Sequence, residues 1–151
     1  MPAPHSPQHP RHNQQNPGRA AAVPALNFSD IRFTKPLDPE LFNERALKAA
    51  EGIASGKKDI DKGTQLRRFY NELVLWASRV ERQREHFADY LPFIRMLNAK
   101  AAYAEGRKLV SREFVDLLAH TLREVNSAET LATCKLFWEA FMGFYKQKRN
   151  D

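Results

Sequence analysis

The sequence predicts an all-α protein, in which an N-terminal tail is followed by a single-domain bundle of five helices. Two observations support this fold class. After Pro36, apolar residues recur at steps of three and four, the spacing of one helix face, and no strand-like alternation or hairpin turn appears. The chain has 151 residues, 42% of them hydrophobic, so it is long enough to bury the core of one domain.

Residues 1–27 are expected to form a disordered tail, and residues 28–151 the helical bundle. Six of the nine prolines lie in this tail, together with Gln, Asn and His, so it has too little apolar surface to offset the entropy of ordering. Three of its histidines have a spacing that would suit a metal on a helix: His5, His9 and His12. The prolines between them argue against a helix, and we therefore expect no metal site there.

The first two helices have clear signals. Asp38 is expected to cap the first helix, which stops at Gly56. The second is expected over residues 64–84. Arg68 and Arg79 lie three turns apart and share the face opposite to the apolar one. The apolar face of this second helix is formed by Leu66, Phe69, Tyr70, Leu73, Ala77 and Val80.

The remaining three helices follow with short connections. The third is expected over residues 87–105 with Gly106 as its C-cap, and Pro92 either delays its start or kinks it. Ser111 is expected to cap the fourth helix and Ser127 the fifth, which is rich in aromatic residues.

Few residues could form an active site. The folded part contains two histidines, His86 and His120, both expected at the surface. Cys134 lies in an apolar helical stripe and is expected to be a buried structural thiol rather than a nucleophile. No phosphate-cradling glycine loop, GxSxG or HExxH motif occurs. We therefore expect no enzymatic activity, no cofactor and no bound metal.

The single cysteine excludes an intramolecular disulfide and fits a reducing compartment. No apolar run reaches the roughly 18 residues of a membrane span, and the N-terminus lacks the apolar core of a signal peptide. These features predict a soluble cytoplasmic protein that does not enter a membrane. Lys and Arg number 24 against 18 for Asp and Glu, a net charge of +6 that suits an anionic partner, although many basic proteins have none.

The first of two basic stretches is "KGTQLRRFYNEL", residues 62–73. Thr64 is expected to cap the helix and to leave backbone N–H groups free at its positive end, which suits a phosphate. The polar side chains that accompany it are Lys62, Gln65, Arg67 and Arg68. A capped surface helix with solvated arginines remains the alternative interpretation.

The second basic stretch is "NAKAAYAEGRK", residues 98–108. Helical phase separates Ala101 and Ala104, which suit a close helix–helix contact, from a polar stripe on another side. That stripe is formed by Lys100, Tyr103 and Arg107, and Lys108 extends its charge past the glycine. A solvated surface stripe is again the alternative, and whether Tyr103 packs or contacts a ligand stays open.

Three segments in this order resemble a known family: "KGTQLRRFYNEL", "LNAKAAYAEGRKLVSREFVDLL" and "ETLATCKLFWEAFMGFYK". They are similar to the small helical subunit of the type III-A CRISPR effector, the Csm complex, over about residues 62–146. The resemblance implies a non-catalytic five-helix bundle, copies of which stack as the inner filament of a ribonucleoprotein together with other Csm subunits. Its members line the groove where guide RNA pairs with target RNA and contact the sugar-phosphate backbone without reading bases.

The resemblance also implies which residues contact RNA. Those expected on the second helix are Thr64, Gln65, Arg67 and Arg68, and those expected to extend the surface are Lys100, Tyr103, Arg107 and Lys108. Gly63 departs from the family pattern, which often has a second hydroxyl residue at this position, and the Pro/His-rich tail is not part of the family core. A helical adaptor that binds only proteins is the competing hypothesis.

Overall fold

The computed structural model describes residues 2–4 and 26–151. Most of the predicted disordered tail, residues 1–27, lies outside the described residues. The three histidines of that tail, His5, His9 and His12, lie outside them as well. The elements in chain order are η1 (Leu41–Arg45), α1 (Ala46–Ala54), α2 (Gly63–Arg82), η2 (Arg84–His86), α3 (Phe87–Arg95), α4 (Leu97–Gly106), α5 (Arg112–Arg123) and α6 (Ala128–Lys148). Within residues 2–4 and 26–151 there is no strand, and the all-α fold is confirmed.

The third predicted helical segment is divided in two. Pro92 lies inside α3, where it has no N–H to donate and its ring crowds the preceding turn. The chain turns at Met96, whose N–H still donates to the Pro92 carbonyl oxygen at 3.0 Å. The predicted disturbance therefore appears as a break between α3 and α4, four residues after the proline.

The first helix begins later than predicted. Asp38 accepts a hydrogen bond from the N–H of Glu40 at 2.9 Å, but the helical residues start at Leu41. The carboxylate of Asp38 also bonds to the guanidinium of Arg45 at 3.0 Å. The Glu40 N–H and the Arg45 guanidinium hold the pKa of Asp38 below its ordinary value. Asp38 thus organises the turn before the helix and the wide turn η1.

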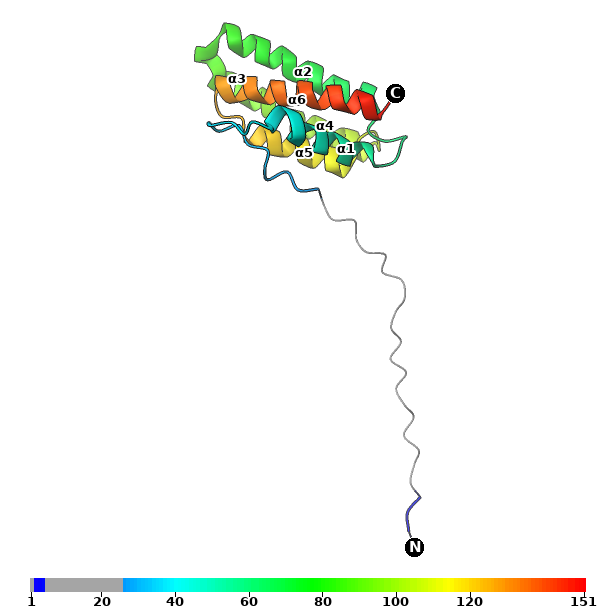
Figure 1. The fold of residues 1–151 in the computed structure, drawn as a ribbon. Helices are drawn as coiled ribbons and strands as arrows, with labels where there is room; N and C mark the ends of the chain where they lie inside the picture. Colours follow the sequence, from blue (N-terminus) through cyan, green and yellow to red (C-terminus); the bar gives the residue numbers. More distant parts are fainter. Residues whose placement is uncertain (1, 5–25) are drawn as a thin grey trace.

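Helix α6 is the central element of the bundle. It packs against α1 on one side and α2 on the other, while α4 packs against α5. Figure 1 shows this arrangement, with α6 crossing the molecule between α2 and the layer formed by α1, α4 and α5. The side chains of α6 that fill the core include Phe137, Trp138, Phe141 and Tyr145. The predicted apolar faces of the helices are confirmed.

The caps predicted for the last two helices are confirmed. Ser111 accepts a hydrogen bond from the N–H of Phe114 at 3.2 Å, and Ser127 from the N–H of Thr130 at 3.1 Å. Each serine thus satisfies one of the backbone donors that a helix start leaves free.

The segment before the first helix is part of the core, which the sequence pattern did not indicate. Ile31 and Phe33 are 3% and 2% exposed. His120 lies 2.7 Å from the carbonyl oxygen of Ile31 through its Nε2 and is half-buried, so the prediction of a surface histidine is wrong for this residue. His86 is exposed, as predicted.

The guanidinium of Arg149 joins the end of α6 to the end of α1. It donates to the carbonyl oxygen of Ala54 at 3.2 Å, and Arg149 is 7% exposed. Its other bonds, at 2.8–3.3 Å, go to the carbonyl oxygens of Gly56, Lys57, Lys58 and Ile60. A cation is also favourable at this end of α1 because the helix dipole is negative there. Arg149 therefore holds the whole loop that leads to α2.

Asp61 continues this network across the bundle. It is 1% exposed and has a φ of 60°, and its N–H donates to the carbonyl oxygen of Leu109 at 3.0 Å. Its carboxylate accepts from the N–H of Ser111 at 2.7 Å, and its carbonyl oxygen accepts from the hydroxyl of Tyr145. Burial raises the pKa of Asp61 despite the bond from Ser111. The loop before α2 is thus tied to the loop after α4.

We predict that Arg149→Ala lowers the free energy of unfolding by about 3 kcal/mol, because the buried guanidinium is lost and the carbonyl groups of the loop are left without a charged donor. Chemical denaturation of the variant measures this change. Lys148→Ala is the matched control, since its ion pair with Glu51 at 3.5 Å is exposed and such pairs contribute less than about 1 kcal/mol. Equal denaturation midpoints for the two variants would contradict the role given to Arg149.

Candidate nucleic-acid interface

The start of α2 differs from the prediction by one residue. The helix begins at Gly63, and Lys62 is its N-cap residue without a side-chain cap. The carbonyl oxygen of Lys62 accepts from the N–H groups of Gln65 and Leu66 at 2.8 and 3.1 Å. Thr64 therefore lies inside the first turn, and its predicted role as the cap is wrong. The buried Asp61 just before Lys62 sets the entry of the chain into the helix.

Gly63 lies against Asp151. The N–H of Gly63 is 3.4 Å from the carboxylate Oδ1 of Asp151, so a carboxylate faces a helix start that we expected to be open to phosphate. A Cβ atom on Gly63 would lie 2.4 Å from the backbone oxygen of Asp151, and no side chain fits there. A side chain at this position would therefore require Asp151 to move.

The predicted residues of α2 divide between two clefts. Thr64 and Arg67 line a cleft of about 190 Å³ between α2 and α6, together with Lys146, Arg149 and Asp151. The other two, Gln65 and Arg68, face α4. Successive residues of a helix are about 100° apart, and α2 contacts a neighbour on each of these sides.

The second cleft, here called the α2/α4 cleft, brings five of the nine predicted residues together. It has a volume of about 210 Å³ and is lined by polar side chains over an apolar floor. The predicted residues in it are Gln65, Arg68, Lys100, Tyr103 and Arg107. The structure thus brings residues of both basic stretches into one cleft.

Contacts inside the α2/α4 cleft orient its side chains. The guanidinium of Arg107 lies over the ring of Tyr103, 5.8 Å from its centroid, and Tyr103 is 68% exposed. Tyr103 thus does not pack in the core. Lys100 forms an ion pair with Glu72 across the cleft, which neutralises part of its charge. On the other side of α4, Ala101 is 0% exposed, which confirms the predicted close contact with the bundle.

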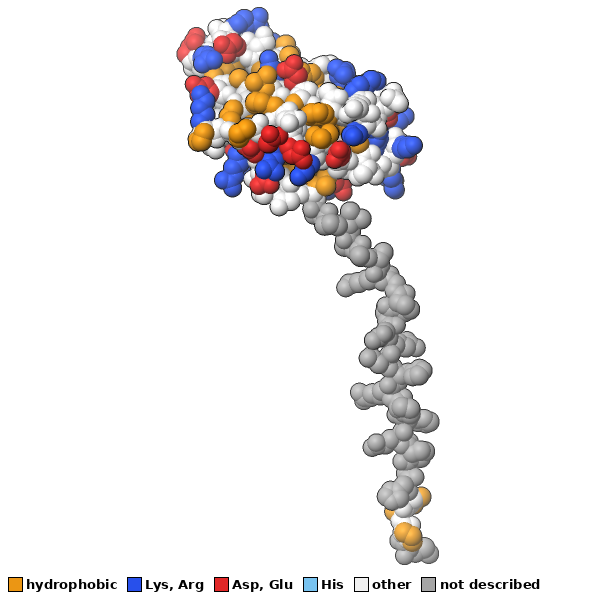
Figure 2. Space-filling model, viewed as in Figure 1, with side chains coloured by type: hydrophobic (Ala, Val, Ile, Leu, Met, Phe, Trp, Pro, Cys, Tyr) orange, Lys and Arg blue, Asp and Glu red, His pale blue; other side chains and the backbone are white. Residues whose placement is uncertain are grey.

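Three of the arginines that line these clefts keep their charge available. Arg67, Arg68 and Arg107 are exposed, and none of them has a carboxylate of the described residues within ion-pair distance. Figure 2 shows Lys and Arg side chains at the end of the molecule where α6 finishes and also at its opposite end. Uncompensated cations of this kind attract an anionic partner.

Lys108 has a structural role at the end of α4. Its φ is 61°, and its N–H donates to the carbonyl oxygen of Glu105 at 2.9 Å. The N–H of Leu109 donates to the carbonyl oxygen of Ala104 at 2.9 Å, which completes a Schellman motif. The left-handed residue is therefore Lys108 and not Gly106, whose predicted capping role is wrong. Lys108 is exposed, but it lines a different cleft, which includes Lys57.

The described residues offer little to a metal or a reaction. No group of three or more His, Cys, Asp and Glu side chains that could hold a metal occurs in residues 2–4 and 26–151. Burial raises the pKa of Cys134 to about 12, so its thiol stays protonated at neutral pH. Among the described helices, none combines the length and the apolar character needed to cross a membrane.

Sequence reasoning missed part of the basic surface. Arg79 and Arg82, near the end of α2, line a cleft of about 390 Å³ with Gln83 and Tyr90. The signal was present, since Arg79 shares a helix face with Arg68. The neighbouring third helix could not be placed from the sequence pattern alone.

The fold and these clefts define a small basic helical bundle with arginines open to an anionic partner. Residues 38–151 match the family model described as Csm2 Type III-A. This match covers most of the chain, so the chain belongs to the Csm2 family, the small subunit of the type III-A CRISPR complex. The other subunits of that complex are therefore its partners. Comparison with curated proteins and with solved structures gave no match.

We predict that Lys108→Gly raises the free energy of unfolding by about 0.5–1 kcal/mol. Glycine removes the left-handed strain of about 1–2 kcal/mol, and part of this gain is offset by its greater freedom in the unfolded chain. Denaturation with urea measures the change. Lys108→Ala removes the same charge but retains the strain, so an equal gain in that variant would rule out the conformational explanation.

Proposed function

We propose that this Csm2 subunit binds the sugar-phosphate backbone of guide and target RNA through the α2/α4 cleft, without reading the sequence. In this proposal several copies stack into the inner filament of a cytoplasmic antiviral ribonucleoprotein, and the subunit itself catalyses no reaction. One observation carries the proposal. Arg68 and Arg107 line the same cleft from two different helices, and neither has a carboxylate of the described residues within ion-pair distance.

The chemistry of the cleft suits phosphate. Arg68 and Arg107 each offer a forked set of donors that matches phosphate oxygens. Gln65 and Tyr103 line the same cleft and can donate to phosphate or sugar oxygens. Such contacts position a backbone but carry no sequence information, which is consistent with a complex in which base pairing between guide and target reads the sequence.

A single subunit is expected to bind RNA weakly. Its net charge is only +6, and Lys100 is already paired with Glu72. Several copies along one RNA would act together, because the second contact becomes intramolecular once the first is made. Moderate charge on each copy is therefore compatible with stable binding by the assembly.

The surroundings of the candidate nucleophile, Cys134, and of the two candidate bases, His86 and His120, support a non-catalytic role. Cys134 is 0% exposed, and its raised pKa keeps it in the thiol form. His120 is held by the carbonyl oxygen of Ile31, far along the chain. His86 is exposed on η2 and lies 3.3 Å from the carboxylate of Asp89. None of these three residues lines the α2/α4 cleft.

We predict that the double variant Arg68→Ala/Arg107→Ala binds single-stranded RNA about tenfold more weakly at moderate salt, because two phosphate contacts are lost. The slope of log K against log salt should decrease by about 1.4, since each neutralised phosphate of a single strand contributes about 0.7. Fluorescence anisotropy at several salt concentrations measures both quantities. The control is Arg32→Ala/Arg123→Ala, which removes two exposed arginines outside the cleft. An unchanged slope in the cleft variant would rule out this surface as the RNA site.

We also predict that the native complex purified from its host contains guide RNA. Sequencing of the RNA that copurifies with the full-length chain checks this, and repeat-derived guides are the expected result. The absence of RNA from the purified complex would instead favour an adaptor that binds only proteins.

A further inference from the structure

A line of exposed side chains runs from the α2/α4 cleft along α4 and α3. Its members follow one another at steps of three and four residues: Phe93, Met96, Lys100, Tyr103 and Arg107. The three apolar members, Phe93, Met96 and Tyr103, are 53%, 48% and 68% exposed. Lys100, Tyr103 and Arg107 line the α2/α4 cleft, and the two members toward and beyond the break, Met96 and Phe93, are apolar.

At the far end of this line, Phe93 belongs to an aromatic group on the outside of the bundle. Its ring stacks on Trp76 with centroids 5.9 Å apart and an interplanar angle of 19°. Tyr90 contacts Trp76 at 5.8 Å, and the guanidinium of Arg79 lies 5.2 Å from the Trp76 centroid. We call Trp76, Arg79, Tyr90 and Phe93 the Trp76 cluster. Its rings and its cation come from α2 and α3, and Phe93 is the most exposed of its apolar members.

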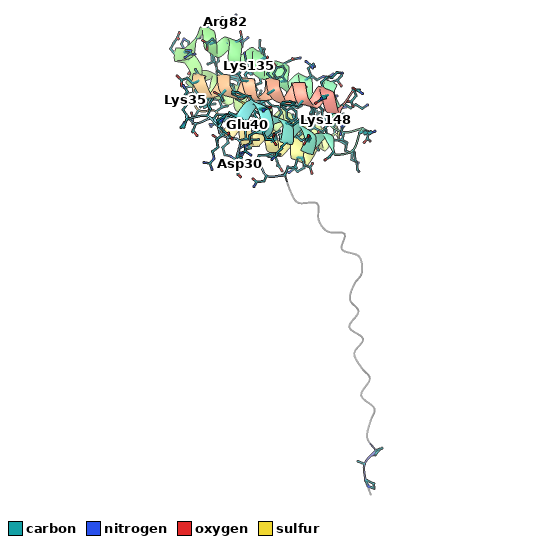
Figure 3. The ribbon with its side chains drawn as sticks, viewed as in Figure 1. Asp30, Lys35, Glu40, Arg82, Lys135 and Lys148 are labelled. Atoms are coloured by element: carbon teal, nitrogen blue, oxygen red, sulfur yellow. The ribbon has the colours of Figure 1, made fainter. Side chains whose placement is uncertain are left out.

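Cations surround the Trp76 cluster. Arg79 and Arg82 line the 390 Å³ cleft beside Tyr90, and neither has a carboxylate of the described residues within ion-pair distance. The acidic residues on this part of the chain have other partners: Glu81 pairs with Arg84 at 2.9 Å, and Glu85 and Asp89 lie 3.8 and 3.3 Å from the ring nitrogens of His86. Figure 3 shows Arg82 at the opposite end of the molecule from Lys148, so these two arginines are separate from the cations at the end of α6.

We infer that the Trp76 cluster stacks an unpaired base of single-stranded RNA, while Arg79 and Arg82 hold the adjoining phosphates. This inference rests on the proposed backbone contact and extends it, because the same strand would pass from Arg68 and Arg107 to Phe93. Arg68 and Arg79 are eleven residues apart on one helix face, which corresponds to about 16 Å along the axis.

The composition of the surface favours a base over an apolar peptide. An apolar protein partner would bury Arg79 and Arg82 without supplying an opposite charge, which is costly. A nucleotide is complementary to both features of this surface: its flat base can stack on the exposed face of Phe93, and its phosphate can bind the arginines. Proteins that bind single strands without sequence preference combine aromatic rings and cations in this way.

The test compares two RNA probes of equal length and charge with the full-length chain: a single-stranded oligouridylate and an abasic strand that has the same backbone. The abasic strand is expected to bind roughly tenfold more weakly, because one stacked base is lost. The oligouridylate should also quench tryptophan fluorescence. The chain has two tryptophans, and Trp138 is 3% exposed in the core, so the quenched residue would be Trp76. Trp76→Phe retains a ring and should remove the quenching.

Phe93→Ala is the decisive variant. It should weaken oligouridylate binding roughly tenfold, leave abasic binding unchanged, and leave the salt slope as in the unaltered protein. Leu136→Ala is the matched control, since Leu136 is 45% exposed on α6 outside this surface and its loss should change nothing.

Three results separate the possibilities. Equal binding of the two probes would overturn base stacking, and so would unaltered oligouridylate binding by Phe93→Ala. The backbone proposal is then tested separately by the salt slope of the Arg68→Ala/Arg107→Ala variant. If Phe93→Ala instead abolishes self-association in sedimentation while RNA binding persists, the cluster is an interface between copies and the inference is wrong.

Discussion

The hydrogen bonds of Arg149 help to determine how α2 and α4 lie relative to each other. A loop that connects two helices has many carbonyl groups and little apolar surface, so it has no strong preference for one path. One guanidinium satisfies five of these groups at once between α1 and α2. Asp61, at the end of that loop, then bonds to Leu109 and Ser111 beyond α4. The start of α2 and the end of α4 are held together by these two residues, and the α2/α4 cleft lies between them.

The aromatic core side chains of α6 and the arginines of the α2/α4 cleft come from different helices. Rings of α6 such as Trp138 and Phe141 lie in the core, and the indole N–H of Trp138 donates to Thr121 at 3.0 Å. In the α2/α4 cleft, Arg68 and Arg107 are placed together, and neither has a carboxylate of the described residues within ion-pair distance. Two like charges in one cleft repel each other, and an anion that enters relieves this repulsion. The core therefore stabilises an arrangement of charges that would not be favourable by itself.

The regular parts of the fold could be predicted because helix faces depend on local spacing, and the serine caps depend on residues three positions apart. Features set by distant residues could not be predicted. Ile31 and Phe33 are buried by tertiary contacts although no periodic pattern surrounds them. Thr64 has the residue type of a cap, but the buried Asp61 starts the helix earlier. Lys108 adopts a conformation that its residue type disfavours because the contacts of Leu109 require the turn there. The division of the predicted α2 residues between two clefts depends in the same way on which helices lie beside them.

The sequence separation of the Arg149 contacts has a consequence for folding. Arg149 and Ala54 are 95 residues apart, and Asp61 and Tyr145 are 84 apart. Contacts that close such long segments require most of the chain to be collapsed first, and they form late compared with helix turns. We therefore expect the α2/α4 cleft to acquire its shape late in folding. A peptide that contained α2 to α4 alone would have the same arginines, but it would lack the two distant residues that align them.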